Sequence, residues 1–148
     1  MNVTWRFVVF QGEARRIFGE KLSNVLVAVE EAEGPSEVKL QTERERFLRA
    51  PVVVAVISST NQERGVPEIE QILSSGAACC NLCLAANALG YGTSWITEWY
   101  ALSPGIHDVL RLGDNEQIAG FEYVGTANEK QDDRDRPMFD AIFEHWND

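Results

Sequence analysis

The alternation of hydrophobic and polar positions in the first sixty residues predicts two strands separated by two helices. Residues 3–10 are rich in β-branched and aromatic side chains, which is typical of a strand. Residues 13–30 carry apolar side chains at helical spacing and therefore form one face of an amphipathic helix. Ser36 is a suitable N-cap for a second, highly charged helix that ends near Arg49. The continuous apolar run 52–57 has the length of a strand, and we expect it in the centre of a sheet.

The longest predicted helix covers residues 68–89 and ends at Gly90, a residue that favours a helix C-terminus. From Gly76 onward the remaining faces carry mostly small apolar side chains, so we expect this half to be buried nearly all round. The stripe at helical spacing consists of Ile69, Ile72, Leu73, Ala77, Cys80, Cys83 and Leu84.

The last third of the sequence predicts two more strands, residues 92–97 and 118–124. Between them, Ser103 followed by Pro104 predicts an N-capped short helix. A charged segment follows, and residues 137–146 resume an apolar pattern. The order of these elements predicts one layered domain. It does not distinguish an antiparallel α+β sheet from a parallel α/β sheet.

The composition of the chain excludes some classes of binding partner. The 148 residues carry a formal net charge of −10, spread along the whole sequence, so phosphate backbones and anionic membranes would be repelled. The first residues lack the basic and then apolar layout of a signal peptide. We therefore expect a soluble cytoplasmic protein without nucleic-acid or membrane partners.

Cysteine and histidine give little support to metal or nucleophile chemistry. Cys80 and Cys83 form a C-x-x-C pair, but zinc needs four ligands and no second pair or nearby histidine exists. The pair lies inside an apolar helix, where free cysteine behaves as a small hydrophobe. His107 and His145 lie far apart, and neither accompanies a nucleophile motif. We expect no metal site and no catalytic side chain.

Several short motifs occur in a characteristic order. They are Trp-Arg-Phe at residues 5–7, Arg-Ala-Pro at 49–51, Gly-Tyr-Gly-Thr-Ser-Trp-Ile-Thr at 90–97, Gly-Phe-Glu-Tyr-Val-Gly-Thr at 120–126 and Arg-Asp-Arg-Pro at 134–137. In this order the sequence resembles the nitroreductase family of FMN-dependent oxidoreductases, especially its small members. The resemblance runs through nearly the whole chain.

The resemblance implies a fold, a cofactor and a site. The fold is α+β, a mixed, mainly antiparallel sheet flanked by helices, with the flavin at the interface of a homodimer. FMN accepts hydride from NADH or NADPH and passes electrons to a small acceptor such as a nitro compound or quinone. Trp95 and Ile96 would line the flavin site, and the loop at Thr97 and Glu98 would direct a backbone N–H at flavin N5. Trp99 and Tyr100 are further candidates for lining the pocket, and Arg134 and Arg136 would hold the phosphate, Arg136 more strongly.

One departure from the family pattern leaves two functions open. Family members begin with a helix bearing an Arg-Arg-Ser type motif that grips FMN, whereas this sequence starts at the following strand, with Thr4 where a proline is usual. We therefore expect one nitroreductase-like domain over residues 1–148, short at its amino terminus and weaker in FMN binding. The alternative is a non-enzymatic, flavin-poor dimer that binds a partner or a small ligand.

Overall fold

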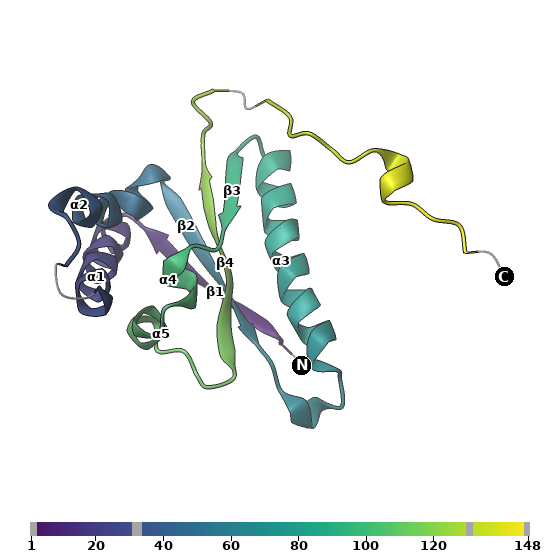
Figure 1. Ribbon diagram of the computed structural model, residues 1–148, viewed down its shortest axis with the longest axis horizontal. Helices are drawn as coiled ribbons and strands as arrows, with labels where there is room; N and C mark the ends of the chain where they lie inside the picture. The colour runs from purple at the N-terminus through teal and green to yellow at the C-terminus, as the bar shows by residue number, and fades with distance from the viewer. Residues whose placement is uncertain (1–2, 31–33, 130–131, 147–148) are drawn as a thin grey trace.

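The computed structural model describes residues 3–30, 34–129 and 132–146, and these form one four-stranded sheet with helices on both faces (Figure 1). The strands are β1 (Trp5–Gln11), β2 (Val52–Ser59), β3 (Gly92–Ile96) and β4 (Glu116–Gly125), in the order β1-β2-β4-β3. All three pairings among them are antiparallel. The α+β fold is thereby confirmed, and β2 is an inner strand as its apolar run predicted.

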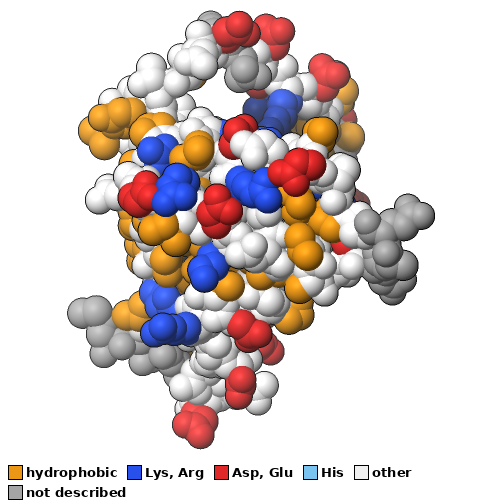
Figure 2. Space-filling view, turned by 90° about the vertical axis from the view of Figure 1, so that its left-hand side faces the viewer, with side chains coloured by type: hydrophobic (Ala, Val, Ile, Leu, Met, Phe, Trp, Pro, Cys, Tyr) orange, Lys and Arg blue, Asp and Glu red, His pale blue; other side chains and the backbone are white. Residues whose placement is uncertain are grey.

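One face of the sheet is covered by α1 (Glu13–Val29), α2 (Glu37–Glu45), α4 (Trp99–Leu102), α5 (Pro104–Leu110) and the 3-10 helix η1 (Arg46–Arg49). We call this the closed face. Figure 2 shows the side of the molecule formed by α1 and α2, where positive and negative side chains are interspersed. The Ser36 hydroxyl accepts a hydrogen bond from the Lys39 N–H at 3.3 Å, which confirms Ser36 as the N-cap of α2. Ser103 is the N-cap residue of α5 and Pro104 is its first residue, as predicted, although the Ser103 hydroxyl makes no capping hydrogen bond.

Aromatic rings fill the closed face. Phe47 of η1 is fully buried, and its ring centroid lies 4.7 Å from that of Phe18 and 5.3 Å from that of Phe121. Gly19 allows α1 to approach α2, because a Cβ at this position would lie 2.0 Å from the Arg44 carbonyl oxygen. The close approach and the ring cluster make this layer a well-packed core.

The opposite face, which we call the open face, is covered by a single helix, α3 (Glu68–Ala88). The buried residues of α3 are Gln71, Ser75, Ala78, Cys79 and Ala86. Much of the predicted apolar stripe instead faces outward, with Ile69, Leu73 and Leu84 each at least 60% exposed. The expectation that this helix is buried nearly all round is therefore wrong for a single chain, because the sheet covers one side of the helix only.

By length and composition α3 is also the one helix among the described residues that could cross a membrane, with a mean hydropathy of 1.3 over 18 residues. Its inner face, however, carries Gln71 and Ser75, which are hydrogen-bonded to the rest of the domain. The Ser75 hydroxyl donates to Ser58 at 2.9 Å, and the Gln71 amide donates to the carbonyls of Asn61 and Val66 at 3.0 and 2.9 Å. These contacts fix α3 as a layer of the folded domain.

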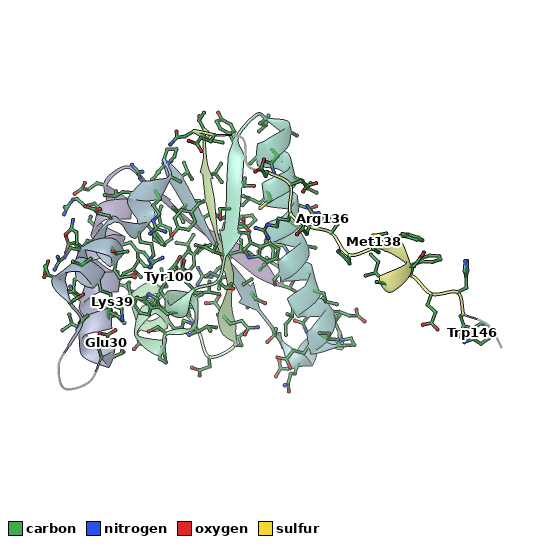
Figure 3. The ribbon with its side chains drawn as sticks, turned by 45° about the horizontal axis from the view of Figure 1, so that its top comes forward. Glu30, Lys39, Tyr100, Arg136, Met138 and Trp146 are labelled. Atoms are coloured by element: carbon green, nitrogen blue, oxygen red, sulfur yellow. The ribbon has the colours of Figure 1, made fainter. Side chains whose placement is uncertain are left out.

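The segment after β4 leaves the body of the domain. Residues 132–146 contain only one short 3-10 helix, η3 (Phe139–Ala141), and extend away from the sheet (Figure 1). Figure 3 shows Met138 and Trp146 on this tail, far from Tyr100 in the core. The apolar tail side chains are exposed, including Met138 at 78% and Trp146 at 83%.

Candidate functional site

The carboxyl end of β3 leads into a loop whose acidic residue is held by a buried arginine. Glu98 is the N-cap residue of α4, and its Oε2 accepts a hydrogen bond from Arg46 Nη1 at 2.5 Å. Arg46 also donates to both carboxylate oxygens of Glu43, at 2.6 Å from Nε and 2.5 Å from Nη2. Since Arg46 is 7% and Glu43 3% exposed, a buried, bidentate ion pair positions the loop acid.

The surroundings keep Arg46 charged. Its hydrogen bonds to Glu43 raise its pKa, and burial opposes this rise. The guanidinium carbon also lies 5.3 Å from the centre of the Tyr100 ring. Three of the five N–H groups of Arg46 are used by the two carboxylates, so donors remain for a ligand.

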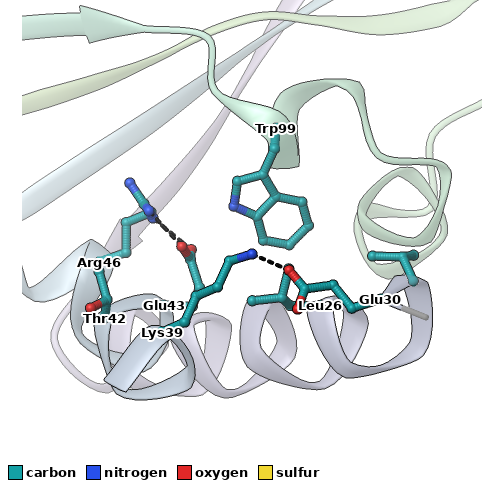
Figure 4. Close-up of a pocket in the computed structure, with 8 residues that line it drawn as sticks. Leu26, Glu30, Lys39, Thr42, Glu43, Arg46 and Trp99 are labelled. Carbon is teal, nitrogen blue, oxygen red and sulfur yellow. Dashed lines mark hydrogen bonds and ion pairs between the residues drawn. The ribbon is translucent and has the colours of Figure 1, made fainter. Parts of the chain in front are cut away.

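A cavity of about 510 Å³ opens beside this ion pair, between α1, α2 and Trp99 (Figure 4). Figure 4 shows the Trp99 indole reaching from α4 toward the two helices, with Lys39 paired to Glu30 across the cavity. The indole N–H of Trp99 is buried and has no hydrogen-bond partner among the described residues. A buried donor without a partner costs free energy unless a ligand or water satisfies it. The lining residues are Leu26, Val29, Glu30, Lys39, Thr42, Glu43, Arg46 and Trp99.

The other residues expected at the carboxyl end of β3 lie on different sides of the strand. Ile96 faces the closed core, whereas Trp95 lies on the open face and its indole covers Gly120 of β4. Trp95 Nε1 donates to the Ala119 carbonyl at 3.3 Å, and the side chain remains 45% exposed. Thr97 is exposed in the loop. Tyr100 is fully buried and bonds to Tyr123 through the two hydroxyls, 3.2 Å apart, so it belongs to the core rather than to a pocket wall.

Within one chain the structure does not bring Arg134 and Arg136 to Thr97 and Glu98. Both arginines are exposed on the tail, and Arg136 pairs with Asp133 at 3.0 Å. Figure 1 shows this part of the tail beyond α3, away from α4.

Arg46 and Glu43 were not among the site residues expected from the sequence. The i, i+3 spacing of opposite charges was visible, but α2 carries many charges and the pair resembled an ordinary solvated helix surface. The decisive contact, from Arg46 to Glu98, joins residues 52 positions apart. Only the fold brings them together.

Cys79 and Cys83 lie on the open face and are unsuited to nucleophile chemistry. Cys79 is buried, and burial raises its pKa to about 12. Burial likewise raises the pKa of Cys83 to about 11, and its thiol donates to Glu122 Oε2 at 2.8 Å. Among the described residues no group of three or more His, Cys, Asp or Glu side chains is arranged to hold a metal ion.

The fold is that of the nitroreductase-like α+β domains. A nitroreductase-like protein of Bacillus cereus has the same fold, with a TM-score of 0.76 and 21% identity over 96% of this chain and 73% of that one. A nitroreductase-type structure from Desulfovibrio desulfuricans, solved in complex with FMN, gives a TM-score of 0.65 at 21% identity, over 96% of this chain and 72% of that one.

The chain belongs to the nitroreductase family, whose family model matches residues 1–126. A protein of Escherichia coli K12 named as an NAD(P)H nitroreductase, YdjA, is 31% identical over 126 residues. That alignment covers 85% of this chain and 67% of the relative. The resemblance found in the motifs is thereby confirmed.

Proposed function

We propose that this protein is an FMN-dependent oxidoreductase that transfers electrons from NADH or NADPH to a small organic acceptor, such as a nitro compound or a quinone. Family membership and relatives named as NAD(P)H nitroreductases support the oxidoreductase class. The FMN complex of a structural neighbour supports the cofactor. When bound, FMN supplies the two-electron chemistry, so the protein needs no side-chain nucleophile.

The observation that carries this proposal is the Arg46–Glu98 pair beside the unpartnered Trp99 N–H. The pyrimidine edge of a flavin is rich in hydrogen-bond acceptors. Arg46 and Trp99 provide unused donors next to the loop at Thr97 and Glu98, and Arg46 stays positively charged. These residues therefore fit the group. Arg46 would stabilise negative charge on the reduced ring, and the backbone of the loop would lie beside the redox-active nitrogen.

We further propose that the protein works as a homodimer. The outward stripe of α3 and the apolar tail leave large side chains uncovered, including Leu73 at 63% and Phe139 at 64% exposed. In a dimer the tail of one subunit would bring Arg134 and Arg136 to the partner's site, where they would hold the FMN phosphate. The cytoplasm, where NADH and NADPH are available, is the proposed location.

Flavin titration tests the proposed function. We expect the purified chain to bind FMN in preference to FAD, with the change in visible absorbance that accompanies flavin burial. Arg46→Met keeps the bulk of the side chain and removes the charge, so it should weaken FMN binding by about ten- to a hundredfold. Circular dichroism shows whether the variant remains folded. If the parent chain binds no FMN at high concentration, the enzymatic proposal fails and the flavin-poor binding dimer is favoured.

A further inference from the structure

Arg49 is an exposed arginine that forms no ion pair and no side-chain hydrogen bond with the described residues. Three adjoining hollows nevertheless include it in their lining, with volumes of about 370, 200 and 390 Å³. The smallest of the three contains Arg49, Ser94, Ile96 and Tyr123. Ile96 directly precedes Thr97 and Glu98, so this hollow lies beside the loop of the proposed flavin site.

The geometry of η1 orients Arg49 toward this region. A 3-10 helix has three residues per turn, so side chains at i and i+3 eclipse each other. Arg46 and Arg49 stand in this relation, about 6 Å apart along the axis. Both positive charges act on Tyr123, whose pKa is raised by burial and lowered by the two arginines. The two arginines therefore face the same part of the sheet, Arg46 at the Glu98 loop and Arg49 one turn further along.

The wall opposite Arg49 is rich in small polar groups. It is formed by the beginning of β3 and the end of β4, where Thr93, Ser94 and Thr126 carry hydroxyls and Gly92 leaves the backbone accessible. β3 is an edge strand of the described sheet, so alternate backbone N–H groups have no strand partner. Among the residues that line these hollows the one acid is Glu45, whose carboxylate accepts a hydrogen bond from Gln41 at 2.5 Å rather than from Arg49.

We propose that Arg49, Ser94 and Thr126 form a phosphate-binding subsite along the edge of β3. An unpaired guanidinium, free hydroxyls and free backbone N–H groups match the oxygens of a phosphate monoester. The subsite deepens the proposed function and rests on it for its ligand, which is the phosphate of FMN or the 2′-phosphate of NADPH. It supplies a fixed cation within one chain, independent of the tail arginines.

Paired ligands that differ only in one phosphate test the subsite. Arg49→Gln should weaken FMN binding by about ten- to a hundredfold and leave riboflavin binding unchanged. If instead the 2′-phosphate is bound, the variant should lose affinity for NADPH and keep that for NADH. Arg49→Lys should restore part of the loss. Arg111→Gln is the matched control, since Arg111 is exposed and lies outside the hollows that contain Arg49.

A titration with inorganic phosphate, followed by the amide NMR signals of Gly92, Thr93 and Ser94, separates the two proposals. Shifts in the parent that are lost in Arg49→Gln support the subsite even if no flavin binds, in which case only the proposed function fails. If the parent binds FMN and Arg49→Gln changes neither the FMN-to-riboflavin nor the NADPH-to-NADH preference, the subsite is wrong and the proposed function stands. Absence of phosphate shifts in the parent would likewise overturn the subsite.

Discussion

The two faces of the sheet are built on different principles. The closed face buries large aromatic side chains such as Phe47, Tyr100 and Phe121 under several helices. The open face is covered by α3 alone, which buries small and polar residues and turns Leu73 and Leu84 outward. The closed face is thus well packed within one chain, whereas the open face presents hydrophobic surface that the described residues of the chain do not cover.

This difference between the two faces indicates that one face stabilises the fold and the other mediates assembly. Aromatic packing on the closed face fixes η1, and through it Arg46 and Glu98, by contacts within one chain. On the open face α3 is attached by hydrogen bonds from Gln71 and Ser75, which position the helix while its apolar stripe remains available. We infer that the closed face sets the stability of the fold and the open face sets association.

A matched pair of leucine truncations should give the largest contrast between the faces. Leu22 of α1 is fully buried and Leu84 of α3 is 61% exposed. Leu22→Ala should cost about 2 to 5 kcal/mol of unfolding free energy, because it leaves a cavity. Leu84→Ala should cost less than about 0.5 kcal/mol at dilutions where the chain is monomeric. Urea denaturation measures both, and equal losses would contradict the contrast.

Measurements of self-association test whether the open face is a dimer interface. We expect light scattering to give a dimer mass, and Leu84→Glu to weaken dimerisation by about ten- to a hundredfold, because the change removes apolar burial. Val38→Glu is the control, since Val38 is 78% exposed on α2 and lies on the closed side. A parent chain that stays monomeric at every concentration would refute the dimer.

The sequence predicted the elements well because their signals are local. The amphipathic pattern of residues 13–30 and the apolar run 52–57 became α1 and β2, and Gly90 takes the positive φ of 88° expected after a helix. The orientation of α3 was not predictable in this way. Periodicity identifies an apolar stripe, but it does not tell whether the sheet or another subunit covers it, and the inner face depends on hydrogen bonds to distant residues.

The same distinction between local signals and contacts between distant residues applies to the candidate site. Glu98 and its neighbours followed from a motif, since the whole loop is contiguous in sequence. Arg46 and Arg49 did not, because their positions depend on how η1 packs against β3 and β4. The roles of Arg134 and Arg136 stay predictions, since they depend on where the tail lies in an assembly.

The ionisation of Glu122 tests how well the open face excludes water. It is fully buried on β4, where the thiol of Cys83 donates to one oxygen and the other oxygen has no partner among the described residues. Burial raises its pKa above the usual 4.5. Glu116, on the same strand, has the opposite setting: its hydrogen bond from Arg6, at 2.7 Å, lowers its pKa. One strand therefore carries two glutamates whose effects on stability have opposite signs.

The two glutamates should make the unfolding free energy depend on pH in opposite ways. Because burial raises the pKa of Glu122 in the folded chain above its value of 4.5 in the unfolded chain, stability should fall as the pH rises from 4.5 toward the folded pKa. The slope is at most about 1.4 kcal/mol per pH unit, and Glu122→Gln should remove it. Glu116 contributes above its unfolded pKa and loses that contribution as the pH falls, so Glu116→Gln should flatten the acid side by less than about 1 kcal/mol, given the exposure of Arg6. Urea denaturation between pH 3.5 and 8 measures all three chains. Parallel profiles for the parent and Glu122→Gln above pH 4.5 would mean that Glu122 is ionised in the fold, and that the open face admits water or a cation at this carboxylate.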